Sequence, residues 1–157
     1  MREILFRAKT ESGRWIEGDL IHYQSGEVAI IEKPFSKYGY EATEICRRTL
    51  ALPDTICQYT GLTDKNGNKI WENDIVAFHH YEFGGFSGMN EFGFPILNPS
   101  KERVRNYAIE FVNTFCTYGL RFRNKSIHFP CKLSTLRMHD VEVIGNIFDN
   151  ADLLKGE

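Results

Sequence analysis

Two adjacent histidines, His79 and His80, are by residue type the clearest candidates for metal binding in this sequence. They end a stretch with strand patterning, and neighbouring side chains on a strand point to opposite faces, so both imidazoles do not easily reach one metal. The four cysteines are separated by ten, 58 and 14 residues, without a CxxC pair or a nearby CxxH. This spacing argues against a zinc ribbon or a thioredoxin-like site. We expect no metal and no cofactor, with a site that gathers Cys57, Cys116 or His128 in space as the alternative.

Arrangements typical of nucleophilic catalysis or phosphate binding are not found in the sequence. It contains no GxSxG motif, and the glycines at 84, 85 and 88 are not followed by Lys-Ser or Lys-Thr. We therefore predict no catalytic residue and favour a protein that is not an enzyme. The alternative is a small hydrolase or transferase whose site forms at a subunit interface from Asp19, Asp74 or His79.

A cluster of basic residues is the strongest functional signal. Residues 101–125 contain six basic side chains against two acidic ones, a local charge of +4. We call five of them the basic stripe: Arg103, Arg105, Arg121, Arg123 and Lys125. In strand conformation Arg121, Arg123 and Lys125 project from one face, and Arg103 and Arg105 do the same on their own strand.

If the two strands pair, the basic stripe and the nearby Tyr107 and Tyr118 form a surface suited to nucleic acid. The cations contact the phosphate backbone and the aromatic rings stack on bases. The other interpretation is a solvated strand face whose charges protect a sheet edge from aggregation. The formal net charge of -2 for the whole chain favours this second interpretation.

The length and composition of the chain place these residues in a globular protein. With 157 residues, 42% hydrophobic and 13% aromatic, the chain is of single-domain size and has enough apolar surface for a core. The N-terminus becomes polar at once, and no apolar run reaches membrane-spanning length. We therefore expect one domain over 1–157, in the cytoplasm, with reduced cysteines and no membrane partner.

Alternating and β-branched segments predict seven or eight strands with little helix. Turn formers at 10–13, Ser25-Gly26 and Asn66-Gly67 separate several of them. The expected strands are 3–9, 14–17, 19–24, 27–32, 73–79, 103–112, 115–123 and 140–148. Asp149 or Asn150 caps a short C-terminal helix. The expected core includes Trp15, Leu20, Trp71, Ile75, Val76, Val143 and Ile147.

Two segments have no clear pattern. Residues 81–100 contain four glycines, two prolines and four phenylalanines but no basic residue, which predicts a long loop. Because exposed phenylalanines are unfavourable, this loop is expected to fold over its own domain or to dock on a neighbouring subunit. Residues 38–52 fit a helix or a strand equally well.

A short pattern occurs twice. Residues 15–21 (WIEGDLI) and 70–76 (IWENDIV) share apolar, apolar, Glu, Gly or Asn, Asp, aliphatic, aliphatic. Gly18 and Asn73 tolerate positive φ, and Asp19 and Asp74 accept backbone N–H groups in turns. This predicts one turn-and-strand unit used twice, in which the aspartates serve the turn.

The second copy and its flanks carry a family resemblance. Residues 58–67 (QYTGLTDKNG) followed by 70–76 resemble the central signature of YopX-like proteins, and 2–8 and 142–154 resemble the first and last segments of that family. Asn73 stands where the family usually has glycine, and Ala151 where proline is common. The segments cover about a third of the chain but span it from end to end.

The resemblance implies a small phage or prophage protein of the bacterial host cytoplasm that self-associates, with a β-rich, barrel-like fold and no established activity. We expect an all-β chain of twisted antiparallel sheets that form a barrel-like core. We further expect a non-enzymatic binding or assembly module that forms a homo-oligomer and contacts a phage or host macromolecule. Nucleic-acid binding and the interface hydrolase stay as alternatives.

Overall fold

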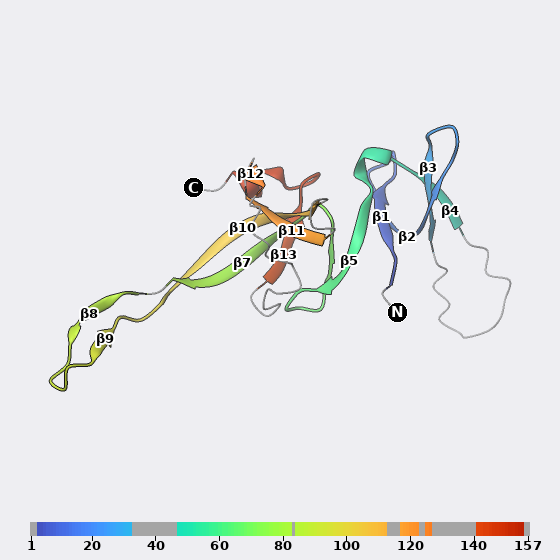
Figure 1. The fold of residues 1–157 in the computed structure, drawn as a ribbon. Coiled ribbons are helices and arrows are strands. Elements are labelled where there is room, and N and C mark those ends of the chain that lie inside the picture. Colours follow the sequence, from blue (N-terminus) through green and yellow to red (C-terminus); the bar gives the residue numbers. More distant parts are fainter. Residues whose placement is uncertain are drawn as a thin grey trace. The chain divides into compact units, whose positions relative to one another are not determined.

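The computed structural model describes residues 3–32, 47–82, 84–112, 117–122, 125–126 and 141–155. They divide into two compact units, the first from Met1–Thr63 and Lys69–Asn73 and the second from Asp64–Asn68 and Asp74–Glu157. Antiparallel strands build both units (Figure 1), so the prediction of a mainly β chain is confirmed. Each unit has its own sheet, and the expectation of one domain over 1–157 stays a prediction.

The first unit is a six-stranded antiparallel sheet in the order β4-β3-β2-β1-β5-β6. Its elements are β1 Phe6–Lys9, β2 Trp15–His22, β3 Val28–Glu32, β4 Arg47–Ala51, the 3-10 helix η1 Pro53–Thr55, β5 Cys57–Thr63 and β6 Lys69–Trp71. Turns with Gly13 and Gly26 at positive φ join β1 to β2 and β2 to β3, as predicted. The part of 38–52 that the structure describes contains β4, whereas 33–46 lies outside the described residues.

One face of this sheet carries an apolar core. Ala8, Ile16 and Ile30 are almost completely buried, with Phe6, Leu20, Ala51 and Ile56 packed against them. After β4 the backbone N–H of Leu52 donates to the carbonyl of Lys9 at 2.7 Å, which bends the end of β4 toward β1. No closed barrel is found among the described strands, so the barrel-like core stays a prediction.

Cationic and aromatic side chains stack on the other face of β1. The Arg7 guanidinium carbon lies 4.7 Å from the ring centre of Trp15 and 5.3 Å from that of Trp71. The Lys69 ammonium lies 5.4 Å from the ring centre of Tyr59, which itself packs on Trp71. These contacts join β1, β2, β5 and β6 on the face opposite the core.

Replacing Arg7 by methionine keeps the aliphatic stem but removes the cation between two indole rings. We expect the free energy of unfolding to fall by about 2 kcal/mol, because the half-buried guanidinium contacts both rings. Urea denaturation of wild type and Arg7→Met measures this loss. Arg48→Met is the matched control, since its guanidinium faces a single ring, that of Tyr23 at 5.7 Å. Equal stability losses in the two variants would contradict the prediction.

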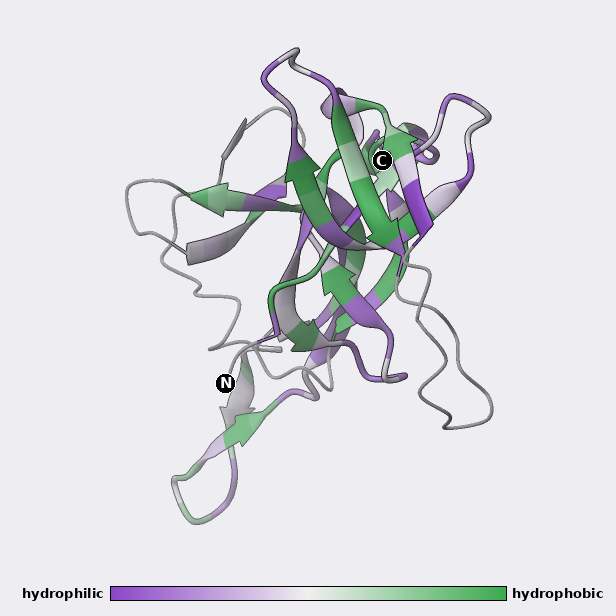
Figure 2. Cartoon of the chain, turned by 90° about the vertical axis from the view of Figure 1, so that its right-hand side faces the viewer, coloured by the Kyte–Doolittle hydropathy of each residue, from purple (hydrophilic) through white to green (hydrophobic). Residues whose placement is uncertain are grey.

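The second unit is a five-stranded sheet in the order β12-β11-β10-β7-β13. Its strands are β7 Asp74–Glu82, β10 Lys101–Val112, β11 Thr117–Phe122, β12 Lys125–Ser126 and β13 Val141–Asn146. Val76, Ile109 and Val141 are fully buried on one face, and Ile75 and Ala108 on the other. Hydrophobic residues recur along the strands of both sheets (Figure 2).

The predicted C-terminal helix is a short 3-10 helix, η5 Ala151–Leu154. It lies against β10, where the Asn106 side-chain amide donates to the Leu153 carbonyl at 2.9 Å. Among the described residues, no helix is long and apolar enough to cross a membrane.

The prediction of a long loop over 81–100 is wrong. β7 continues to Glu82, and β8 Phe86–Met89 pairs with β9 Pro95–Leu97 to form a hairpin. The side-chain carboxamide of Asn90 accepts the backbone N–H groups of Phe92 and Phe94 and so closes the turn. A register shift between Phe86 and Gly88 interrupts the alternation, which explains why the sequence shows no strand period.

The repeated pattern does not form the same structure twice. In the first copy β2 runs through Gly18 and Asp19 without a turn, so the predicted strands 14–17 and 19–24 are one strand. In the second copy Asn73 takes a φ of 65° and separates β6 from β7, as its residue type predicts. Gly18 is required instead for close packing, because a Cβ there lies 1.8 Å from the Ile31 carbonyl oxygen.

The turn 64–68 is attached to the edge strand β13. Asp64 is 5% exposed, and its carboxylate accepts the backbone N–H groups of Asn66, Asn68 and Val143 at 2.9, 2.8 and 3.0 Å. Burial raises the pKa of the Asp64 carboxyl, but the hydrogen bonds from Val143 and Asn68 outweigh burial and leave this pKa below its ordinary value. The turn therefore holds an ionised, buried carboxylate.

Candidate interaction surfaces

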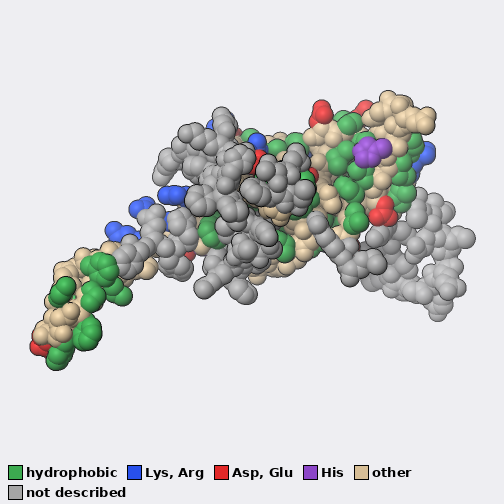
Figure 3. Space-filling view, viewed as in Figure 1, with side chains coloured by type: hydrophobic (Ala, Val, Ile, Leu, Met, Phe, Trp, Pro, Cys, Tyr) green, Lys and Arg blue, Asp and Glu red, His purple; other side chains and the backbone are tan. Residues whose placement is uncertain are grey.

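The β8–β9 hairpin exposes more large apolar side chains than any other described segment. Between 44% and 75% of each of its six large apolar residues is accessible: Phe86, Met89, Phe92, Phe94, Ile96 and Leu97. Apolar side chains cover this hairpin in the space-filling view (Figure 3). Of the two expectations for this segment, folding over its own domain is wrong for the three described phenylalanines, Phe86, Phe92 and Phe94, and docking on a neighbouring subunit stays a prediction. Exposed apolar residues gathered on one segment make this hairpin a candidate interaction surface.

Basic residues adjoin the hairpin on β10. Lys101, Arg103 and Arg105 are all exposed, and Lys and Arg side chains gather beside the hairpin in Figure 3. On the opposite face of the strand, the Glu102 carboxylate is hydrogen-bonded to the His79 ring nitrogen Nδ1 at 2.8 Å. The segment therefore presents positive charge next to an apolar hairpin.

The basic stripe is divided between two faces of the sheet. β10 and β11 do pair, which is the condition that the nucleic-acid interpretation needs, and the register aligns Arg121 with Ala108. Directly opposed residues share a face and successive residues alternate. Arg121 therefore projects with Glu110, its carboxylate neighbour at 3.8 Å, and away from the face of Arg103 and Arg105.

The predicted single face of five cations is thus wrong for Arg121. The alternation along each strand was readable from the sequence, but the register that relates the two strands was not. Arg123 lies outside the described residues, and Lys125 is described in backbone only, on β12. That the five residues of the basic stripe bind nucleic acid stays a prediction, and among those with described side chains Arg103 and Arg105 share one face.

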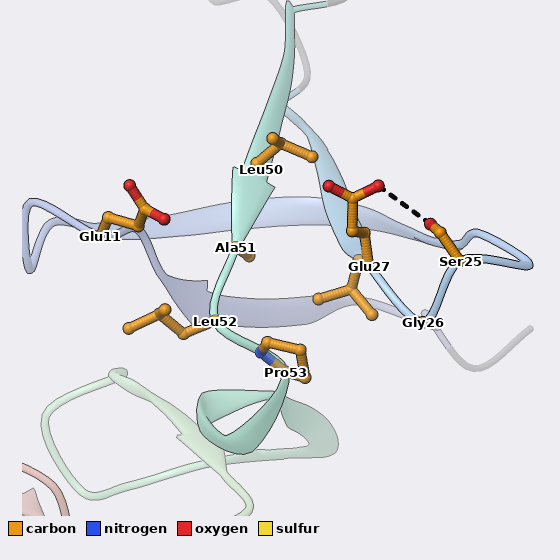
Figure 4. A pocket seen from close by; sticks show the side chains of 9 residues that line it. Glu11, Ser25, Gly26, Glu27, Leu50, Ala51, Leu52 and Pro53 are labelled. Carbon is orange, nitrogen blue, oxygen red and sulfur yellow. Dashed lines mark hydrogen bonds between the residues drawn. The ribbon is translucent and has the colours of Figure 1, made fainter.

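An open depression of about 330 Å³ lies in the first unit (Figure 4). We call it the acidic hollow; its lining includes Glu11, Glu27, Val28, Leu50, Leu52 and Pro53. Leu50 and Leu52 are 58% and 38% exposed, and Val28 is buried. No described residue that lines it is basic. Sequence reasoning missed this site, because its parts come from two turns and from the end of β4.

The residues of the hydrolase alternative do not converge on a described depression. Asp19 is exposed on β2 of the first unit, whereas Asp74 is 1% exposed on β7 of the second. His79 is paired with Glu102. A second depression, lined by Tyr23, Glu27, Arg48 and Leu50, adjoins the acidic hollow. None of the three hydrolase candidates lines either depression. Among the described residues no group of three His, Cys, Asp or Glu could hold a metal ion.

A comparison with protein-family models shows to which family the chain belongs. The model of the YopX protein matches residues 5–155, which is nearly the whole chain. The chain belongs to the YopX family. A search of curated proteins finds no match.

In this YopX chain, the matched range takes in both surfaces. The β8–β9 hairpin and the acidic hollow each lie within residues 5–155. The resemblance read from the sequence rests on other segments, and the central signature of the family corresponds to β5, β6 and the turn that holds Asp64. The two surfaces therefore lie outside the signature segments.

Proposed function

We propose that this protein is a non-enzymatic, self-associating binding or assembly module of phage or prophage origin that works in the bacterial cytoplasm. Membership of the YopX family supports the origin. The observation that carries the assembly role is the β8–β9 hairpin, with six large apolar side chains exposed to solvent. Covering them removes apolar surface from water, which is the main favourable contribution in protein association.

A second copy of the chain is the partner that fits the hairpin best. A two-stranded hairpin alone is marginally stable in water, and further strands or packing against another element stabilise it. Residues 84–99 contain a single charged side chain, Glu91, so two hairpins approach each other with little repulsion. We propose that hairpins from two copies pack together through their phenylalanine side chains.

Replacing Phe92 and Phe94 by serine tests this proposal. We expect wild-type protein to form an oligomer and Phe92→Ser/Phe94→Ser to be monomeric at micromolar concentration, measured by light scattering after size-exclusion chromatography. Both side chains are at least two-thirds exposed, so the fold of the monomer is retained. Ile4→Ser, at a residue 65% exposed in the first unit, is the matched control and keeps the wild-type mass. An unchanged mass in the double serine variant would refute hairpin-mediated assembly.

Nucleic-acid binding is the second candidate function, supported by the exposure of Arg103 and Arg105 on one face of β10. We expect Arg103→Gln/Arg105→Gln to weaken binding of a single-stranded oligonucleotide and to reduce the magnitude of the slope of log K against log salt by about 1.4. Fluorescence anisotropy at several salt concentrations measures both. Arg47→Gln/Arg48→Gln removes two exposed arginines of the first unit and is the control. Affinity that does not depend on salt would remove this candidate.

A further inference from the structure

The acidic hollow combines an apolar floor with two carboxylates on opposite sides. Figure 4 shows Glu11 on one side and Glu27 on the other, with Leu50, Ala51 and Leu52 between them. The depression holds about 330 Å³, room for a few amino-acid side chains. A ligand that spans it meets negative charge at both ends and hydrocarbon in the middle.

Both carboxylates are carried by well-defined turns. Glu11 lies in the turn closed by the N–H of Gly13 and the carbonyl of Thr10 at 2.9 Å. Glu27 follows the turn in which the N–H of Gly26 donates to the carbonyl of Tyr23 at 3.0 Å. The Ser25 hydroxyl also donates to the Glu27 carboxylate at 2.9 Å. The turns fix the backbone positions of both glutamates, and the hydrogen bond from Ser25 also orients the Glu27 carboxylate.

The leucines between them lie at the end of β4. Leu50 and Leu52 are large apolar residues that remain substantially exposed, although Val28 and Ala51 beside them are buried or half-buried. Arg48 lines the adjoining depression together with Glu27 and Leu50, and its guanidinium is placed over the ring of Tyr23. Arg48 therefore neighbours Glu27, but it is not among the described residues that line the hollow, whose charged side chains are Glu11 and Glu27.

From this arrangement we propose that the acidic hollow binds a short extended peptide segment whose every second residue faces the protein, with large apolar side chains in the middle of that face and lysine or arginine at its two ends. The apolar side chains pack on Leu50 and Leu52, and the basic side chains pair with Glu11 and Glu27. Aliphatic stems of lysine or arginine add to the apolar contact while their charged ends stay in water. The site belongs to the first unit, so the proposal is independent of the hairpin-mediated assembly.

The two carboxylates favour a basic peptide over the other ligands that an apolar depression can bind. An acidic peptide or a nucleic-acid backbone meets two carboxylates and is repelled, whereas a neutral apolar segment leaves both without a counter-charge. Because exposed ion pairs contribute little, we expect weak binding that falls as salt is added.

The experiment uses a fluorescein-labelled lysine–leucine peptide, Lys-Ser-Leu-Ser-Leu-Ser-Lys, whose lysines and leucines share one face when it is extended; it is titrated with the full chain and followed by anisotropy. We expect saturable binding that weakens about tenfold in Glu11→Gln/Glu27→Gln, since two exposed ion pairs are lost. Leu50→Ser is expected to weaken it as well. The matched control, Glu17→Gln/Asp19→Asn, removes two exposed carboxylates of β2 outside the hollow and is expected to bind as wild type.

Peptide controls and spectra give the outcomes that overturn the proposal. Glutamates in place of the lysines, or serines in place of the leucines, are expected to abolish binding, and equal binding of either peptide refutes the proposed chemistry. Amide NMR signals of Gly26, Leu50 and Leu52 are expected to shift on addition of the lysine–leucine peptide. If they shift instead with protein concentration alone, a second copy occupies the hollow and the proposal fails. Absence of binding at millimolar peptide also refutes it.

Discussion

Asp64→Ala is expected to lower the free energy of unfolding by about 2–4 kcal/mol, because it leaves partly buried amide donors without their buried acceptor. The carboxylate accepts three backbone N–H groups and the side-chain amide of Asn68, at distances between 2.8 and 3.1 Å. Two of these donors form the turn 64–68 and a third, Val143, lies on β13. The substitution therefore removes hydrogen bonds within the turn and one of its links to the edge strand, although the Lys65 N–H still donates to the Val141 carbonyl.

Urea denaturation of purified variants measures this loss, with Asp152→Ala as the control because that carboxylate is fully exposed. Asp64→Asn is expected to lie between wild type and Asp64→Ala. An asparagine keeps one acceptor oxygen of similar shape but presents an amide where a second acceptor is needed. A loss below about 1 kcal/mol in Asp64→Ala, the level of a surface change, would show that the turn does not depend on this carboxylate.

The same carboxylate makes stability depend on pH in acid. The pKa of Asp64 is lowered in the folded state, so its contribution is complete above the ordinary value near 3.8 and is lost as pH falls through the folded-state pKa. Unfolding midpoints between pH 5 and pH 2 are expected to fall more steeply for wild type than for Asp64→Asn. Parallel curves would mean that other carboxylates account for the acid sensitivity.

Strand patterning and turn chemistry predicted most of this fold from the sequence. Gly13, Ser25-Gly26 and Asn66-Gly67 identified three turns that the structure contains, and alternation located β10, β11 and β13 within a few residues. Trp71, Ile75 and Val76 are buried as expected, whereas Trp15, Leu20, Val143 and Ile147 are half-buried. These features depend on neighbouring residues, which is why a sequence reveals them.

What the sequence did not reveal depends on contacts between distant residues. The register of β10 against β11 sends Arg121 to the face opposite Arg103, and no local pattern specifies it. The β8–β9 hairpin was hidden because Gly85 and Gly88 take positive φ and interrupt the alternation. The acidic hollow combines residues 11, 27 and 50–53, which come together only when β4 has joined β3.

The two copies of the repeated sequence pattern also have different structures. In 15–21 and 70–76 the fourth position of the pattern is Gly18 or Asn73. Asn73 is at positive φ in a turn, whereas Gly18 is a strand residue that lets a neighbouring strand approach. Alanine is therefore expected to affect stability differently at the two positions. The effect is larger at Gly18, because the backbone of Ile31 has to move to make room for the new methyl group.

Gly18→Ala is expected to destabilise the protein by more than about 3 kcal/mol, because the added methyl group meets backbone that cannot rotate away. Its Cβ lies 1.8 Å from the carbonyl oxygen and 2.6 Å from the carbonyl carbon of Ile31. Gly119→Ala is the matched control on a strand of the second unit, where the added Cβ meets only a side-chain methyl of Val112 at 2.9 Å. Chemical denaturation of the two variants compares them directly.

The consequence of Gly18→Ala reaches the acidic hollow, since Ile31 belongs to β3 and β3 carries Val28 at its other end. Displacing β3 from β2 moves Glu27 and Val28 relative to Glu11, so we expect any folded Gly18→Ala protein to bind the lysine–leucine peptide more weakly than Gly119→Ala does. Equal stability of the two alanine variants would contradict the close approach of β2 and β3. If Gly18→Ala loses stability but binds the peptide as tightly as Gly119→Ala does, the geometry of the acidic hollow does not depend on the close packing of β2 against β3.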